Sequence, residues 1–132
     1  MNCEKNKKMS NIWRGVILEE SLDNLSLLEL ARIKDSYKYQ LEGEDRVMTF
    51  YNVEVDDSQK AGYVKKAARN IKDKFYTHLC KDGIITVIFR NKTFEFSKDH
   101  PLIESARKYG LSMGILPEQM CFERIIDNPF DE

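Results

Sequence analysis

His78 and Cys80 are separated by one residue, and an imidazole beside a thiol can do two kinds of chemistry. Alternate residues of a β-strand project from the same face, so both side chains would share one surface. A metal site would need two further donors, such as His100 or Cys121, and no motif spacing requires them. A nucleophile and base at this spacing have Cβ atoms about 7 Å apart, which is long for catalysis. A buried thiol beside a surface histidine is therefore the simpler interpretation, and no metal or cofactor is predicted.

Basic residues are concentrated in the segment 58–72, where the spacing of apolar residues predicts an amphipathic helix. The predicted apolar face consists of Ala61, Val64, Ala68 and Ile71. The predicted basic face consists of Lys65, Lys66, Arg69 and Lys72. Such a face suits the phosphates of a nucleic acid or an acidic partner, but a solvated helix surface has the same composition. The glycine and aromatic motif of the common RNA-binding sheet module is missing.

The composition indicates a globular chain without a strong electrostatic preference for any partner. The 132 residues are 42% hydrophobic and 33% charged, and the formal net charge is −1. This length fits one domain, predicted over 11–126, with a flexible arm at 1–10 and a mobile acidic tail at 127–132. A near-neutral chain is not drawn as a whole to nucleic acid or to an anionic membrane.

The cysteines and the short apolar runs indicate the cellular compartment in which the protein is expected. Three cysteines occur at wide spacings without a CxxC pair, which favours free thiols in a reducing cytoplasm. No apolar run approaches the roughly 20 residues that span a bilayer, and no secretory signal is recognisable. Neither common glycine-rich phosphate loop occurs, so nucleotide-dependent chemistry by those routes is not expected.

Two hydrophobic periods predict an α+β fold. Apolar residues alternate over 47–55, as in a strand with one buried face, and the 3.6-residue period of a helix follows in 58–72. The predicted elements after these are strands at 84–89 and 93–97, a helix from Pro101 to Gly114, and a last strand at 121–126. This β-α-β-β-α-β order is that of the ferredoxin-like fold, with two helices on one face of the sheet.

The N-terminal part adds an extension to this predicted core. A strand at 13–20 and a short helix within 21–33, capped by Asn24 or Ser26, would form an edge strand or cover the other sheet face. A weak strand is predicted at 37–41, followed by a turn at 43–45. Whether 84–97 is a hairpin or one long strand is left open by the pattern.

The strand 84–89 reads IITVIF and is apolar on both faces apart from Thr86. A half-exposed strand has one polar face, so this strand is predicted to be central and covered on both sides. The second cover would be the N-terminal segment or another copy of the chain.

The absence of a catalytic motif favours a non-catalytic domain that binds a protein partner or a small ligand. A homodimer through the sheet face is one form of partner binding. The first alternative is a nucleic-acid-binding module that uses the basic helix 58–72. The second alternative is a small enzyme centred on His78 and Cys80.

Overall fold

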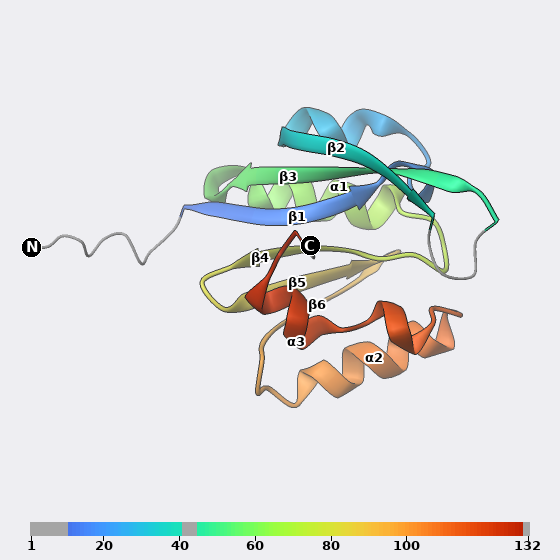
Figure 1. Cartoon of the computed structure of the whole chain (residues 1–132). Helices are drawn as coiled ribbons and strands as arrows, with labels where there is room; N and C mark the ends of the chain where they lie inside the picture. The colour runs from blue at the N-terminus through green and yellow to red at the C-terminus, as the bar shows by residue number, and fades with distance from the viewer. Residues whose placement is uncertain (1–10, 41–44, 131–132) are drawn as a thin grey trace, which may run out of the picture.

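A six-stranded antiparallel sheet forms the centre of the protein in the computed structural model, which describes residues 11–40 and 45–130 (Figure 1). The strands are β1 (Ile12–Leu18), β2 (Arg32–Gln40), β3 (Val47–Asp56), β4 (Thr77–Lys81), β5 (Ile84–Phe89) and β6 (Lys92–Ser97). Their order across the sheet is β2-β3-β1-β4-β5-β6, and each neighbouring pair is antiparallel. The α+β class predicted from the sequence is therefore confirmed. The segment 84–97 is a hairpin, with its turn at Arg90 and Asn91.

The helices lie on opposite faces of this sheet, as Figure 1 shows. The α-helices are α1 (Lys60–Asn70), α2 (Leu102–Ser112) and α3 (Phe122–Asp127). Four 3₁₀ turns complete the described part: Glu19–Ser21, Leu25–Leu30, Asp57–Gln59 and Pro117–Gln119. Two buried clusters follow from this arrangement, one beneath α1 and the turn Leu25–Leu30 and the other beneath α2 and α3.

The ferredoxin-like topology is not confirmed, and two predictions that supported it are wrong. The two long helices cover opposite faces rather than one face. The segment 121–126 is not a strand but lies largely in α3, because Phe122, Ile125 and Ile126 recur at helical spacing and are all buried. The N-terminal part does add an edge strand, β2, and the turn Leu25–Leu30 helps to cover one face, although the first strand β1 is third in the sheet order.

The strand β5 is covered on both sides, as its sequence predicted. Ile85, Val87 and Phe89 pack in the cluster with α2 and α3, whereas Ile88 is fully buried in the cluster with α1. These helices cover the two faces of β5. The N-terminal segment alone does not provide the cover, and a second copy of the chain is not needed for it. The β5 pattern therefore gives no reason to require a dimer.

The helix α1 is rotated relative to the predicted apolar face. Tyr63, Ala67 and the following Ile71 are fully buried, whereas Ala61 is exposed and Val64 is only half-buried. A buried tyrosine removes more surface from water than the Ala61 or the Ala68 side chain would, so packing of Tyr63 favours this side of α1 against the sheet.

A polar cluster around Trp13 fixes the start of α1 against β1 and β4. The indole Nε1 of Trp13 donates a 2.7 Å hydrogen bond to Asp57, and Lys81 forms an ion pair with the same carboxylate at 3.0 Å. The Trp13 hydrogen bond, followed by the Lys81 hydrogen bond, lowers the pKa of Asp57. The Lys60 ammonium lies 4.1 Å from the centre of the Trp13 ring. Trp13 is therefore a buried structural residue rather than a docking group at a chain end.

Gly15 lies where β1 and β4 approach each other most closely. A Cβ atom at this position would lie 2.0 Å from the backbone carbonyl oxygen of His78 and 3.0 Å from the Leu79 side chain. Main-chain atoms of an interior strand cannot move aside without disturbing their hydrogen bonds. Only glycine fits here without a shift of the backbone.

Replacing Gly15 by alanine is expected to lower the free energy of unfolding by about 1–3 kcal/mol, because the added methyl overpacks the contact between β1 and β4. The same change at Gly62 is the matched control, since nothing lies within 4 Å of a Cβ there. Gly62→Ala is expected to raise the free energy of unfolding by about 0.5–1 kcal/mol, because alanine favours an exposed helical position. Urea denaturation measures both changes, and a shift of the same sign in both variants would contradict the close approach.

Candidate functional site

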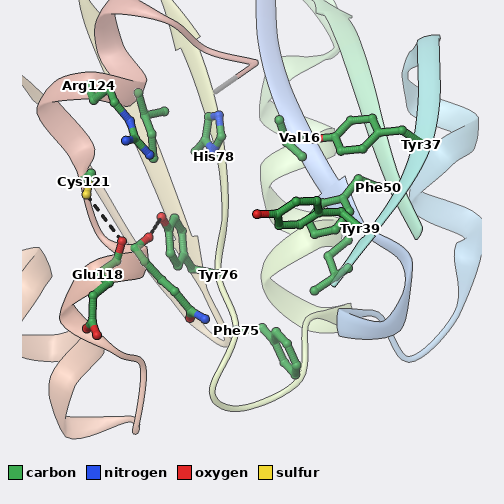
Figure 2. Close-up of a pocket in the computed structure, with 13 residues that line it drawn as sticks. Val16, Tyr37, Tyr39, Phe50, Phe75, Tyr76, His78, Glu118, Cys121 and Arg124 are labelled. Atoms are coloured by element: carbon green, nitrogen blue, oxygen red, sulfur yellow. Dashed lines mark hydrogen bonds between the residues drawn. The ribbon is translucent and has the colours of Figure 1, made fainter. Parts of the chain in front are cut away.

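A groove of about 530 Å³ lies on the sheet face that α2 and α3 cover only in part. Its residues come from β1, β2, β3 and β4 on the sheet, and from the segment 118–125 that contains the start of α3. Thirteen residues line it: Val16, Leu18, Tyr37, Tyr39, Phe50, Phe75, Tyr76, His78, Glu118, Gln119, Cys121, Arg124 and Ile125. Figure 2 shows the aromatic side chains of β2 and β3 on one side, the α3 residues on the other and His78 between them.

The sheet side of the groove is an aromatic wall, which is defined here as Tyr37, Tyr39 and Phe50. The register pairs Tyr37 with Phe50, and the two rings are stacked at 5.3 Å with planes 7° apart. Tyr39 meets the same Phe50 ring edge-on at 6.3 Å. Tyr37 is 38% exposed and Tyr39 is 60% exposed, so two phenol rings on an edge strand remain accessible beside the groove. Accessible rings of this kind bind other flat groups by stacking.

The opposite side is the segment 118–125, defined here as the α3 wall, which carries most of the polar groups. The Tyr76 hydroxyl donates to the Gln119 carbonyl, and the Cys121 thiol donates to the Glu118 carbonyl at 3.4 Å. These bonds fix the short connection before α3 against the sheet. Glu118 and Arg124 add one acidic and one basic side chain to the lining.

His78 lies on the sheet between these two walls and is 5% exposed. Its Nε2 is 2.7 Å from the carbonyl oxygen of Pro129, and because a carbonyl only accepts, Nε2 carries the proton in this hydrogen bond.

The C-terminal residues also contact the domain through Asp127, which forms an ion pair with Lys98 at 2.7 Å. Asp127 and Pro129 thus both contact the rest of the domain, whereas residues 131–132 and the predicted arm at 1–10 lie outside the described residues.

Cys80 shares a strand face with His78, as predicted, but it points into the core rather than into the groove. Its side chain is 2% exposed and its Sγ lies 3.7 Å from the Ile125 carbonyl oxygen. Burial raises the pKa of the Cys80 thiol to about 12. The thiol is therefore protonated at neutral pH, which disfavours both nucleophilic attack and metal binding.

The structure does not gather the other predicted donors around His78 and Cys80. Cys121 lines the groove, whereas His100 accepts a hydrogen bond from the Leu102 backbone at the start of α2. Within residues 11–40 and 45–130, no three His, Cys, Asp or Glu side chains are placed to hold a metal ion.

The basic residues of α1 form a separate feature. Lys65, Arg69 and the following Lys72 are exposed, and Lys66 is half-buried. The buried side of α1 belongs to the cluster on one face of the sheet. Cys80 belongs to the cluster on the other face, and His78 projects from β4 on the same side as Cys80. The groove and the basic face consequently lie on opposite sides of the sheet and do not form one site.

The sequence reasoning missed most of the groove. Tyr37 and Tyr39 lie in β2, which was predicted only as a weak strand over 37–41, and Phe50 was not among the residues of the predicted apolar face of β3. One signal was available, since Tyr37 and Tyr39 are two residues apart and would share a face of any strand. The α3 wall could not be predicted as a side of the groove, because the pattern of 121–126 was interpreted as a strand.

Comparisons with known proteins give no relative of this chain: no family model, no curated protein and no solved structure matches it. In the described part of the chain, no helix is both long and apolar enough to cross a membrane.

Alkylation with iodoacetamide at neutral pH is expected to modify Cys121 rapidly and Cys80 only after denaturation. A pKa of about 12 instead of the ordinary 9.0 leaves the Cys80 thiolate about a thousandfold scarcer, and burial excludes the reagent as well. Peptide mass spectrometry assigns the label to each cysteine. Fast modification of Cys80 in the folded protein would restore the hypothesis of a nucleophile beside His78.

Proposed function

We propose that the protein is a non-catalytic domain that binds a small ligand with a flat, largely apolar body in the groove between the aromatic wall and the α3 wall. The observation that carries this proposal is the groove itself. Its volume of about 530 Å³ falls within the usual range of small-molecule sites, roughly 300–1,000 Å³. A concave, mainly apolar lining with a few polar groups is also usual for such sites.

The two walls have different roles in this proposal. Tyr37 and Tyr39 present accessible rings, so a flat ligand body stacks against them and gains both apolar burial and ring–ring attraction. Glu118, Gln119 and Arg124 lie across the groove and supply polar side chains that orient the ligand. Val16 and Leu18 of β1 form the apolar surface of the sheet between the two walls.

The enzyme hypothesis is less well supported than ligand binding. Its proposed nucleophile, Cys80, is buried and its thiol pKa is raised. Its proposed base, His78, donates through Nε2 to a backbone carbonyl. A homodimer through the sheet also loses its original motivation, because Ile88 and the rest of β5 are covered by helices of the same chain.

Flat bicyclic fragments such as indole and quinoline are expected to shift the methyl NMR signals of Val16, Leu18 and Ile125, which line the groove. Val16→Trp is expected to abolish these shifts because an indole ring occupies the groove. Tyr39→Ala is expected to weaken fragment binding about three- to tenfold, which corresponds to the loss of one stacking contact.

Leu111→Ala is the control variant, because Leu111 is also a large exposed side chain but lies on α2, outside the groove lining. It is expected to leave fragment binding unchanged. Cyclohexane derivatives of similar size test the need for a flat body and are expected to bind more weakly. Unaltered binding to Val16→Trp, or fragment shifts confined to other parts of the protein, would refute the groove as the ligand site.

A further inference from the structure

The outer side of α1 carries a stripe of uncompensated positive charge. Lys65 and Arg69 are one helical turn apart, about 6 Å along the axis, and Lys72 continues the stripe just after the helix. No ion pair or side-chain hydrogen bond involves these three cations within residues 11–40 and 45–130. The helix itself contains no acidic residue. Two acidic groups on neighbouring elements are already paired, since Glu95 binds Lys60 and Asp23 binds Arg90. Asp73 directly follows Lys72 in the chain, so Lys65 and Arg69 are the cations farthest from an acidic neighbour in sequence.

A shallow hollow of about 360 Å³ runs beside this stripe, between α1 and the turn that joins β5 to β6. Ala61, Val64 and Ala68 form its floor, and Lys65 and Arg69 border it together with the turn residues. The small floor residues let a narrow chain come close to the helix. Lys92 also lines the hollow, and its ammonium lies 5.3 Å from the centre of the Phe94 ring.

Two hydrogen bonds hold the far side of this hollow in place. The Asn91 backbone N–H donates to the Ala68 carbonyl at 2.9 Å, and the Arg90 guanidinium donates to the Ile71 carbonyl at 2.9 Å. Asn91 has φ of 59°, so the turn is tight and projects its polar side chain at the border. The hairpin and the helix are therefore fixed relative to each other before any partner arrives.

The chemistry of this surface selects among anionic partners. The large exposed apolar residues of the described chain lie on other elements, so no group on α1 could insert into a lipid bilayer. No exposed aromatic ring borders the hollow, so bases would not stack there and a nucleic acid would be held by its phosphates alone. A row of exposed cations is complementary in charge to such regularly spaced phosphates.

From these features we infer that the outer side of α1 binds the phosphate backbone of a nucleic acid without reading its sequence, with Lys65, Arg69 and Lys72 as the phosphate contacts. This surface lies across the sheet from the ligand groove, so the inference is independent of the function proposed above. Three phosphate contacts make the binding weak and dependent on salt.

Fluorescence anisotropy with a fluorescein-labelled RNA of mixed sequence, about 20 nucleotides long, tests this inference between about 50 and 200 mM salt. The logarithm of the affinity is expected to fall against the logarithm of the salt concentration with a slope of roughly −2, from about 0.7 for each of the three contacts. The double variant Lys65→Glu/Arg69→Glu is expected to lose at least about tenfold in affinity at the lower salt concentration. An RNA of different sequence is expected to bind equally well.

The matched control is Lys34→Glu/Lys108→Glu, which changes the net charge by the same amount at exposed positions on β2 and α2. Circular dichroism verifies that both double variants are folded.

Absence of RNA binding at the lower salt concentration, or equal losses in the two double variants, would overturn the inference. Equal or tighter binding to polyglutamate, or to vesicles of phosphatidylcholine and phosphatidylserine, would also overturn it, because the partner would then be an acidic protein or a membrane. The groove variant Val16→Trp is expected to bind RNA as the wild type does.

Discussion

Three residue pairs between β1 and β4 hold the two halves of this sheet together. Arg14 pairs with Cys80, Gly15 with Leu79 and Val16 with His78, and the Thr77 hydroxyl adds a 2.6 Å hydrogen bond to the Val16 carbonyl. On one side of this junction lie β2 and β3, and on the other lie β5 and β6. The two halves form a continuous sheet only because Gly15 permits the strands to approach closely.

A helix spans this junction on one face of the sheet but not on the other, and the groove results from this difference. On one face, Tyr63 and Ala67 of α1 pack in a cluster that contains Val53 of β3 and Ile88 of β5, so this helix spans both halves. On the other face, the cluster of α2 and α3 contains residues of β4, β5 and β6 only. The α3 wall therefore ends near the junction, and the aromatic wall on β2 and β3 remains uncovered opposite it.

Elements with one strong hydrophobic period were predictable from the sequence, and those with competing periods were not. The alternation over 47–55 identified β3, and the two apolar faces of 84–89 correctly indicated that β5 is covered on both sides. The segment 121–126 is too short to distinguish a strand from a helix by pattern alone, and burial of Phe122 with Ile125 decides for the helix. The groove could not be predicted, because it depends on which part of a sheet face the helices leave open. His78 and Cys80 were correctly placed on one strand, but alternation does not reveal that Cys80 is in the core.

The position of β1 inside the sheet has a consequence for how the chain reaches its native state. β1 is the first of the six strands to leave the ribosome, yet its neighbours β3 and β4 lie dozens of residues later in the chain. By contrast, β2 with β3 and β4 with β5 and β6 are local hairpins, which close at a small entropic cost. During synthesis both edges of the nascent β1 are unpaired until β3 exists, and the second edge stays unpaired until β4 follows, so the order of translation opposes the order of assembly.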